Sequence, residues 1–417
     1  MRRRLIAAAV LILAAVAGAV PAQADVAQPR VVSADPVDFT PHALDGTVRA
    51  IAVVGPTVVV GGTFTAIAND DRSRSGRRPY LFAFDAKSGA IRTSFTPMLD
   101  GAVYALAAGP DNTVYAGGAF RTVNGVESRG LTRLSVGSGA RVRPFDAEIN
   151  WGDVRTLAVN GRRLYAGGPF SAVNGVARAG LARLDAVTGA VDTGFDARLA
   201  APDLARVRVE DMALSPDGRR LVTVGALTQA AGQPRNQLAM YDVAGPRAVL
   251  ANWHTDAFAG ACDRSLDTYL RGVDFSPDGA YFVTVTTGAL PGPARMCDTA
   301  ARFETAGTGL HRPTWVNHTG GNTLFSVSVT GSAVYVGGHQ QWLDNPRGAK
   351  SKGPGAVDRP GIGAINPKTG KALPWNPTRA RGVGARAIVA TSYGLYVGSD
   401  TDKLGKEYHG RIGMFPL

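Results

Sequence analysis

Two stretches of the sequence repeat the same pattern. Val103–Ala147 reads VYALAAGPDNTVYAGGAFRTVNGVESRGLTRLSVGSGARVRPFDA, and Val154–Ala197 reads VRTLAVNGRRLYAGGPFSAVNGVARAGLARLDAVTGAVDTGFDA. Both contain VNG, L-x-RL and a final FDA at matching offsets. A period of about 50 residues is typical of repeat architectures, in which each repeat is one supersecondary unit that packs against the next.

Each repeat divides into four short β-patterned runs. In the second copy these runs are Arg155–Val159, Leu164–Gly168, Gly180–Asp185 and Ala190–Phe195. Asn160-Gly161 separates the first two, and Asn-Gly between apolar runs favours a type I′ hairpin turn. Four antiparallel strands per repeat are typical of a β-propeller blade.

Two markers count the repeats independently. The first is the glycine that ends the second run, or its substitute, at Gly61, Gly117, Gly167, Gly225, Thr286, Gly337 and Gly398. The second is an aromatic residue in the fourth run, at Phe39, Phe95, Phe145, Phe195, Trp253, Trp315 and Trp375. We expect these aromatic side chains to pack between blades rather than to form a stacking platform for sugars. Both lists predict seven blades.

The two ends of the chain are predicted to complete one blade together. Phe39 precedes any first strand, whereas the last repeat stops after its third strand, Arg411–Phe415. Val37–Thr40 would then supply the missing fourth strand and leave no exposed sheet edge at the seam. The sequence therefore predicts an all-β chain in which residues 25–417 form a single seven-bladed β-propeller of four-stranded blades, closed by its N-terminal strand.

The repeat motifs also carry a family resemblance. VYAGG-x-F, VNG, R-x-x-L-x-RL-D-x-x-TG and an aromatic residue with Asp occur in order over Val114–Phe145 and Leu164–Phe195, and more faintly over Val334–Trp375. This pattern resembles the delta-60 repeat β-propellers of secreted bacterial proteins. The middle blades, with Ser215–Gly218 and Ser276–Gly279 both reading SPDG, are instead similar to WD40-like or TolB-like blades. The resemblance implies the fold and secretion, and it implies no activity or catalytic residues.

The N-terminus predicts export. Residues 1–24, with three arginines, an apolar run and a final Ala22-Gln23-Ala24, are typical of a signal peptide cleaved after Ala24. Its removal lowers the formal charge from +12 to +9. No later apolar run is long enough for a membrane span. We expect a secreted or wall-associated monomer that is attracted to polyanions, without specificity for nucleic acid.

The two cysteines predict a disulfide. Cys262 and Cys297 are the only cysteines in the chain. An isolated pair in an exported protein usually forms a disulfide, because the compartment is oxidising. A thiolate metal site would need His or carboxylate partners at finger-like spacing, and none flank them.

No motif for hydrolysis, metal binding or a cofactor is present. The sequence lacks G-x-S-x-G and H-E-x-x-H, and no two of its six histidines lie closer than seven residues. Turns such as Asp185–Gly189 offer one or two carboxylates, whereas calcium needs six to eight oxygen ligands. We therefore predict no catalytic residue, no cofactor and no metal from motifs. An enzyme site assembled from separate blades stays open.

The connections are long on one face only. The long ones join the second strand to the third, or one blade to the next, at Ala66–Pro79, Arg198–Arg208, His254–Tyr269, Gly288–Thr299, Gln340–Pro360 and Asp400–Gly410. In a four-stranded blade these two kinds of connection emerge on the same face, which we call the long-loop face. Loops that lengthen on one side mark a binding face, although tolerated insertions are the alternative.

An arginine recurs on that face shortly before the third strand, at Arg78, Arg129, Arg178, Arg235 and Arg359. Arginine presents a planar fork that suits carboxylate or phosphate, so these five are the predicted ligand-binding residues. The alternative is that each bridges to a carboxylate of the next blade and stabilises the ring.

These observations predict an extracellular, non-enzymatic binding or scaffold module. Its basic long-loop face would meet an anionic wall polymer, a glycan or an extracellular protein. The alternative is a propeller-fold lyase, hydrolase or quinone-dependent oxidoreductase with a pocket at the channel mouth. Convergent His, Tyr, Glu and Arg side chains in a deep pocket would favour the enzyme, and a shallow surface would favour the binding module.

Overall fold

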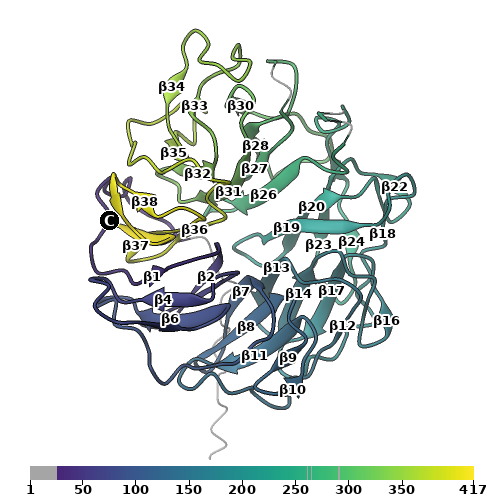
Figure 1. Ribbon diagram of the computed structural model, residues 1–417. Helices are drawn as coiled ribbons and strands as arrows, with labels where there is room; N and C mark the ends of the chain where they lie inside the picture. Colours follow the sequence, from purple (N-terminus) through teal and green to yellow (C-terminus); the bar gives the residue numbers. More distant parts are fainter. Residues whose placement is uncertain (1–25, 261, 264, 290–291) are drawn as a thin grey trace, which may run out of the picture.

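The computed structural model describes residues 26–260, 262–263, 265–289 and 292–417. Within these residues the chain contains strands and turns and no helix, and therefore no helix long and apolar enough to cross a membrane. The predicted signal peptide, residues 1–24, lies outside the described residues. The strands form antiparallel sheets arranged around a common centre, as in a β-propeller (Figure 1).

Seven sheets of the described chain share one plan, in which the first strand pairs with the second and the second with the third. The first strands are β2 (Val48–Val54), β7 (Val103–Gly109), β13 (Thr156–Asn160), β19 (Arg208–Leu214), β26 (Leu270–Phe275), β31 (Leu324–Val329) and β36 (Ala387–Ala390). The second strands are β3 (Thr57–Gly62), β8 (Thr113–Gly118), β14 (Arg163–Gly167), β20 (Arg220–Ala226), β27 (Tyr281–Thr286), β32 (Val334–Gly338) and β37 (Gly394–Gly398). The third strands are β6 (Leu81–Asp85), β11 (Leu131–Ser135), β17 (Leu181–Asp185), β23 (Leu238–Asp242), β28 (Thr299–Glu304), β35 (Ile362–Ile365) and β40 (Ile412–Pro416).

The first strands contact one another in chain order around the centre, and β36 in turn contacts β2. A glycine near the end of most second strands permits this close approach. A Cβ on Gly117 would lie 2.5 Å from Val154 Cγ1, and one on Gly398 would lie 2.5 Å from Val48 Cγ1. Five of the predicted marker glycines are places where one sheet packs against the next: Gly61, Gly117, Gly167, Gly337 and Gly398.

The fourth run of each repeat is less regular than the sequence predicts. It forms a strand in only two of the described sheets, as β24 (Val249–Leu250) and β30 (Trp315–His318). Elsewhere it makes a single bridge, such as Leu184 with Val191, before turning away. The turn forms because Gly194 N donates to Asp192 Oδ1, 3.0 Å, and this local bond competes with the ladder.

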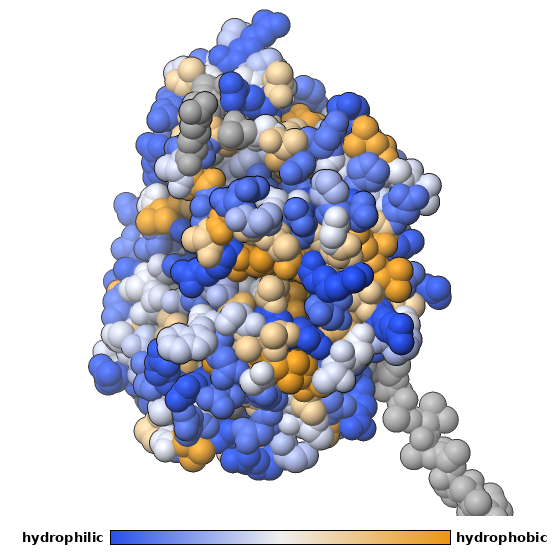
Figure 2. Space-filling model, turned by 90° about the vertical axis from the view of Figure 1, so that its right-hand side faces the viewer, coloured by the Kyte–Doolittle hydropathy of each residue, from blue (hydrophilic) through white to orange (hydrophobic). Residues whose placement is uncertain are grey.

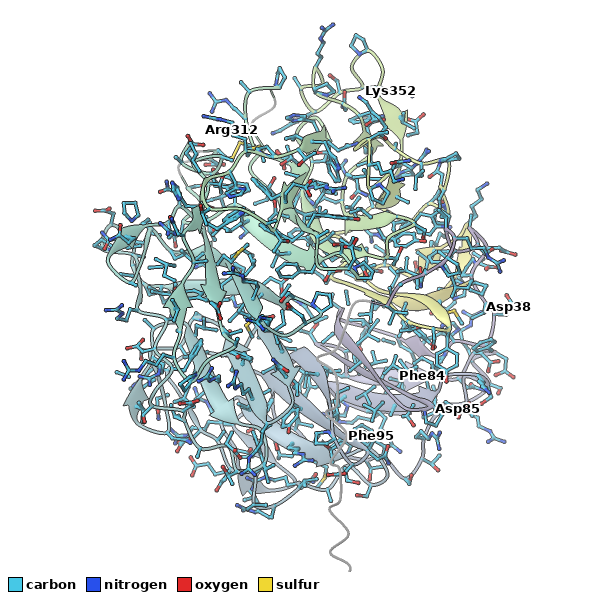
Figure 3. The ribbon with its side chains drawn as sticks, turned by 180° about the vertical axis from the view of Figure 1, so that it is seen from behind. Asp38, Phe84, Asp85, Phe95, Arg312 and Lys352 are labelled. Atoms are coloured by element: carbon cyan, nitrogen blue, oxygen red, sulfur yellow. A yellow bond between two sulfur atoms is a disulfide. The ribbon has the colours of Figure 1, made fainter. Side chains whose placement is uncertain are left out.

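The aromatic markers of this run lie in the core, as predicted. Phe95 and Phe195 are fully buried, and Trp253 is 2% exposed. Phe145 packs edge-on against Tyr115 with 5.4 Å between ring centroids, and Trp375 packs likewise against Tyr335. Figure 3 labels Phe84 and Phe95 within the sheets, whereas Arg312 and Lys352 lie at the periphery of the molecule.

The connections of the long-loop face carry short ladders that the sequence does not predict. Hairpins follow most second strands, as β4 (Ala66–Ala68) with β5 (Ser75–Arg77), β9 (Thr122–Val123) with β10 (Val126–Glu127), β15 (Ala172–Val173) with β16 (Val176–Ala177), β21 (Gln229–Ala230) with β22 (Gln233–Pro234), β33 (Trp342–Leu343) with β34 (Val357–Asp358), and β38 (Lys403–Leu404) with β39 (Glu407–Tyr408). Three of these hairpins also pair with the connection that leads into the first strand of their own sheet. The pairing strands in those connections are β1 (His42–Ala43), β12 (Ile149–Asn150) and β18 (Leu199–Ala200). These three pairings tie both kinds of connection together. A separate parallel pair joins β25 (Trp253–His254) to β29 (Gly309–Leu310), which lies in the connection from β28 to β30.

The N-terminal segment lies along the third strand of the last sheet. Val37 N donates to Met414 O, 2.9 Å, and Ser33 N donates to Pro416 O, 2.8 Å. Trp375 Nε1 donates to Ser33 O, 2.8 Å. The N-terminal segment therefore lies along the edge of β40, the third strand of the last repeat, as the sequence predicts.

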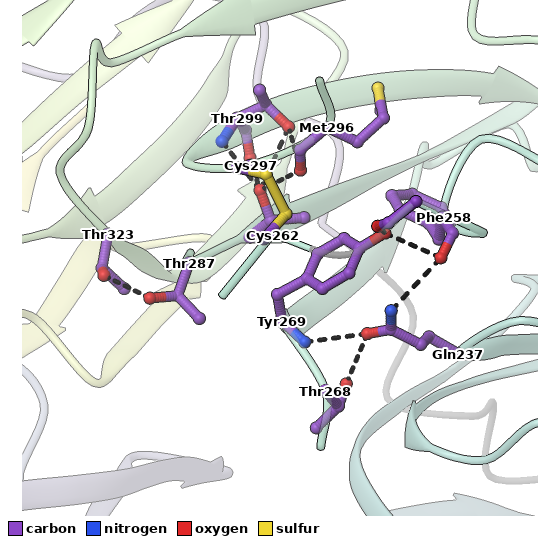
Figure 4. Close-up of a disulfide and its surroundings, with 12 residues drawn as sticks. Gln237, Phe258, Cys262, Thr268, Tyr269, Thr287, Met296, Cys297, Thr299 and Thr323 are labelled. Atoms are coloured by element: carbon purple, nitrogen blue, oxygen red, sulfur yellow. Dashed lines mark hydrogen bonds between the residues drawn. A yellow bond between two sulfur atoms is a disulfide. The ribbon is translucent and has the colours of Figure 1, made fainter. Parts of the chain in front are cut away.

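Cys262 and Cys297 form the predicted disulfide, with 5.6 Å between their Cα atoms (Figure 4). The loop that carries Cys262 is also held by polar contacts. Tyr269 Oη donates to Phe258 O, 2.7 Å, and Gln237 Oε1 accepts from Tyr269 N, 2.8 Å. The disulfide therefore joins two connections that hydrogen bonds already position.

Hydrophilic side chains cover most of the side of the molecule seen in Figure 2, with smaller groups of hydrophobic residues between them. The large exposed hydrophobic side chains of the described residues lie far apart in the sequence, at Met98, Val126, Trp151, Val249, Leu310 and Val383. Single exposed hydrophobic residues are normal on protein surfaces.

Candidate functional site: a basic central cavity

The first strands surround a central cavity of about 630 Å³. One residue from an equivalent position in each repeat lines this cavity. It directly follows the first buried residue of the first strand, or of the segment that leads into that strand. We call these seven the ring residues: Arg49, Tyr104, Arg155, Glu210, Arg271, Phe325 and Arg386. Four of the seven are arginines, although the seven come from different sheets.

A β-bulge directs most ring residues towards the cavity. Val48 pairs with Gly62 and Ala50 pairs with Gly61, so Arg49 is an extra residue in the first strand. The same one-residue shift occurs at Tyr104, Glu210, Arg271 and Phe325. A bulge leaves its residue outside the regular alternation and re-aims the side chain, and such bulges are frequent next to active sites.

Below the ring residues the cavity wall is mixed. The residues two positions further along each first strand are apolar and line an adjoining cavity of about 230 Å³; they are Ile51, Leu106, Leu157, Met212, Val273, Val327 and Ile388. Asp211 and Asp274 line the same cavity, so apolar side chains and carboxylates share this part of the wall.

One side of the ring is internally ion-paired. Arg155 Nη1 lies 2.8 Å from Glu210 Oε2, and Arg271 Nη1 lies 3.7 Å from Glu210 Oε1. Arg208, also in the wall, donates from Nε to Glu210 Oε1 at 2.5 Å. Burial alone would raise the pKa of Glu210, but Arg155, Arg271 and Arg208 outweigh it, so that pKa lies below its ordinary value. Glu210 is therefore held ionised by three arginines.

On the other side of the ring, no carboxylate of the described residues lies at ion-pair distance from the arginines. Arg386 Cζ lies 3.6 Å from the centroid of Phe325, and Arg49 Cζ lies 5.4 Å from the centroid of Tyr104. Arg49 Nε is buried and has no hydrogen-bond partner in the described part of the chain. Burial lowers the pKa of Arg386 to about 10, and repulsion by Arg49 and Arg271 adds to this effect.

Asp211 follows Glu210 in the cavity wall. Its Oδ1 accepts from Thr156 Oγ1, 3.0 Å, and its Oδ2 accepts from Val273 N, 3.0 Å. Burial raises the pKa of Asp211 to about 6, although these hydrogen bonds act in the opposite direction. The lining as a whole contains five arginines and three carboxylates, so the cavity is basic.

The cavity lies at the long-loop face. The ring residues stand at the start of the first strands, where the connection from the preceding sheet arrives. The connection that leads into β13 carries Trp151, whose side chain is 86% exposed and whose φ is 55°. A positive φ is unfavourable for a tryptophan, and such outliers are concentrated at functional sites. Trp151 therefore offers an aromatic contact close to the cavity residues Asp153 and Arg155.

The five arginines predicted from the sequence lie elsewhere on this face. None of Arg78, Arg129, Arg178, Arg235 and Arg359 lines the cavity. Three donate to backbone carbonyls of the fourth run of their own repeat. Arg178 Nη2 bonds to Thr193 O, 3.2 Å, Arg235 Nη2 to Ala251 O, 3.2 Å, and Arg359 Nε to Leu373 O, 3.1 Å.

The remaining two predicted arginines are more exposed. Arg129 forms ion pairs with Glu127, 2.7 Å, and Glu148, 3.2 Å. Arg78 donates from Nη1 to Arg77 O, 3.3 Å. No described contact joins any two of the five, so the structure does not bring them into one site.

The ring residues were missed because each looks like an ordinary strand residue in the sequence. The signal that would have found them is the triplet at the start of the first strand, which reads VRA, VYA, VRT, VED, LRG, LFS and ARA in the seven repeats. Alignment of the repeats on the strand-two glycine places these central residues in one column. In the described chain no group of three or more His, Cys, Asp or Glu side chains is placed to hold a metal ion.

Comparison with known proteins supports the fold. Residues 162–195 match a family model described as "Domain of unknown function (DUF5122) beta-propeller". No curated protein matches the chain. A crystal structure of the computationally designed Ika8 protein is similar, with a TM-score of 0.51 and 11% identity over 93% of this chain and 100% of that chain. The family match is short and the structural similarity shows the fold alone, so these findings together indicate a β-propeller domain.

Proposed function

We propose that this protein is an extracellular, non-enzymatic binding module that holds an anionic ligand in its central cavity. One observation carries the proposal. Four ring residues are arginines, and they converge on one cavity in which Glu210 is the single acidic ring residue. Arginine is suited to carboxylate and phosphate groups because its guanidinium donates in a planar fork.

We also propose the finer architecture on which this site depends. The seven similar sheets are the blades of one propeller, and the N-terminal segment completes the last blade. Contact between β36 and β2, the bonds from Val37 and Ser33 to β40, and the approach of Gly398 to Val48 support this ring. Secretion, by means of residues 1–24, is part of the same proposal, and so is membership of the delta-60 repeat group.

The arginines predicted from the sequence would take a secondary part. Three of them donate hydrogen bonds to backbone carbonyls: Arg178, Arg235 and Arg359. These bonds support a role in holding the fourth run against its sheet. Arg129 keeps an exposed side chain, and Arg78 a half-buried one, on the long-loop face. A polyanion anchored in the cavity would reach these two residues only at its periphery.

The test is binding to an anionic polymer over a range of salt concentrations. We expect wild-type affinity for a polyphosphate or polyuronate to fall steeply as salt rises, because binding releases counterions. Replacement of Arg49, Arg155, Arg271 and Arg386 together by Gln should abolish binding and flatten the salt dependence. The matched control is Arg219→Gln, an exposed arginine in a short turn of the opposite face.

Soluble inorganic phosphate provides a second measurement that does not depend on the folding of the fourfold variant. It should compete with the polymer for the wild-type protein. Binding that persists unchanged in the fourfold variant, or that phosphate fails to displace, would place the anionic ligand outside the cavity.

An enzyme that acts on an anionic substrate is the second candidate. The specific observation in its favour is that Tyr104, Glu210 and Asp211 share the cavity with the arginines. Against it, no histidine lines the cavity, and Glu210 is ion-paired and held ionised, so that it is a poor general acid. An enzyme would shorten or modify polyuronate or polyphosphate chains during incubation, whereas a binding module would leave them intact.

A further inference from the structure

The ring is divided into two unequal halves. Arg155, Glu210 and Arg271 are consecutive around the centre, and Glu210 forms ion pairs with both arginines, at 2.8 and 3.7 Å. Phe325, Arg386, Arg49 and Tyr104 are the next four in order, because β31, β36, β2 and β7 are successive neighbours. This second half contains two arginines, two aromatic rings and no acid.

The aromatic rings orient the two arginines without consuming their hydrogen-bond donors. Arg386 lies over Phe325, and Arg49 lies over Tyr104. A guanidinium that stacks on a ring keeps the N–H groups of its edge available, because those groups lie in its own plane. Arg49 Nε is a buried donor without an acceptor in the described part of the chain.

Two like charges that line one partly enclosed cavity are costly. Repulsion of Arg386 by Arg49 and Arg271 adds to the effect of burial, and attraction by Asp400 and Glu210 does not outweigh them, so the pKa of Arg386 stays lowered. An anion between the two guanidinium groups would remove the repulsion and satisfy the buried Arg49 donor in one step. This arrangement resembles a site completed by its ligand rather than a structural ion-pair network.

We propose that Arg49 and Arg386 together bind one compact oxyanion group, a phosphate, sulfate or carboxylate carried by the ligand, while Arg155 and Arg271 belong to the internal network around Glu210. The proposal rests on the anion-binding function given above and names the part of the cavity that performs it. Two unpaired positive charges match a doubly charged phosphate or sulfate better than a singly charged carboxylate. The expected order of affinity is therefore phosphate or sulfate above carboxylate.

The experiment is calorimetric titration of the purified protein with inorganic phosphate, sulfate and acetate at constant ionic strength. Arg49→Gln and Arg386→Gln should each lower the affinity for phosphate by roughly tenfold or more, the effect of losing charge-assisted hydrogen bonds. Arg155→Gln and Arg271→Gln are the matched controls from the other half of the ring. They should change the affinity less than about threefold, a difference small against that of a charged contact.

Thermal unfolding of the same four variants should rank them in the opposite order to phosphate affinity. Arg49→Gln and Arg386→Gln remove a charge whose described contact is an aromatic ring and not a carboxylate, so their melting temperatures should stay close to that of the wild type. Arg155→Gln and Arg271→Gln remove partners of Glu210 and should lower the melting temperature. Arg386→Lys separates charge from geometry: it keeps the charge but loses the fork, and it should bind phosphate more weakly than wild type and more tightly than Arg386→Gln.

The outcomes distinguish the two proposals. If none of the three anions binds to the wild type or competes with polymer, the proposed function fails. If phosphate binds but all four single variants weaken it equally, or only Arg155→Gln and Arg271→Gln do, anion binding stands and the assignment to Arg49 and Arg386 is wrong. If acetate binds more tightly than phosphate and sulfate, the pair is a carboxylate site and the charge-matching argument is wrong.

Discussion

Arg155 and Glu210 join two neighbouring repeats across the central cavity, with Arg155 Nη1 2.8 Å from Glu210 Oε2. The pair connects the entry to β13 with the bulge of β19, and Arg208 and Arg271 contact the same carboxylate. Glu210 therefore has two effects on the cavity. It stabilises the wall by neutralising arginines, and it opposes the binding of any anion.

Replacement of Glu210 by Gln should separate these two effects. We expect the free energy of unfolding to fall by about 2 kcal/mol, because half-buried arginines lose their partner. We expect the affinity for inorganic phosphate to rise by roughly three- to tenfold, because the cavity gains one positive charge. Urea unfolding and calorimetric titration measure the two quantities. Glu127→Gln, an exposed ion-pair partner of Arg129, is the control and should change neither. Unchanged phosphate affinity in Glu210→Gln would show that the cavity is not the anion site.

The same carboxylate predicts a pH dependence of stability. The pKa of Glu210 in the folded protein lies below its ordinary value of 4.5, so between these two values the unfolded chain binds more protons than the folded one. Its contribution to stability is present above about pH 4.5 and is lost as the pH falls through the folded pKa. Unfolding measured from pH 7 to pH 3 should therefore show a shallower acid loss in Glu210→Gln than in the wild type. Parallel curves would contradict the ion-pair network.

The disulfide should stabilise the repeat that contains it. Cys262 and Cys297 are separated by 35 residues, and closing a loop of this length restricts the unfolded chain by about 4 kcal/mol in the chain-entropy model. The double replacement Cys262→Ala/Cys297→Ala should lower the free energy of unfolding by that order, as should reduction of the wild type. Reduction of the double variant is the control and should have no effect. Equal melting of the oxidised and reduced wild type would contradict the prediction.

Deletion of residues 25–40 should destabilise the whole domain. The deletion removes the bonds from Ser33 and Val37 to β40 and leaves the edge of that strand open. We expect a lower melting temperature and aggregation, followed by light scattering. Trp375→Phe, which removes only the bond to Ser33 O, should cost about 1 kcal/mol and remain soluble. A deletion variant that melts with the wild type would show that the N-terminal segment does not close the ring.

Gln340 offers a stabilising substitution. Its side chain is fully buried, and both Oε1 and Nε2 lack a hydrogen-bond partner in the described structure. It occupies the place that Phe64, Phe120 and Phe170 occupy in their repeats, two residues after the glycine pair. Gln340→Leu should raise the free energy of unfolding by about 1 to 2 kcal/mol, because an unpaired buried amide is removed. The reverse change, Phe120→Gln, should destabilise, and a loss of stability in Gln340→Leu would show that the amide has a partner.

Much of the fold could be predicted from the sequence because its determinants are local and repeated. The strand-two glycines mark where sheets meet: a Cβ on Gly117 would lie 2.5 Å from Val154 Cγ1. The aromatic residues mark the core between sheets, and Phe95 and Phe195 are fully buried there. The fourth run was predicted less well, because Asp192 and Gly194 form a turn whose local hydrogen bond competes with strand pairing.

The candidate site depended on the tertiary structure. Arg49 and Arg386 lie near opposite ends of the chain, and they meet only because β36 packs against β2. The period-two alternation of a strand shows which residues share a face of a sheet, but not which edge of the sheet faces a central axis. The bulge that directs Arg49 into the cavity is one extra residue in the pairing of β2 with β3, and it leaves no mark in the composition. The sequence by itself determined the repeat, the sheets and the disulfide, because each follows from residues close together or from a single pair of thiols. Only the packing of successive first strands around a common cavity decided that four arginines from distant repeats face one another there, since no single strand carries this information.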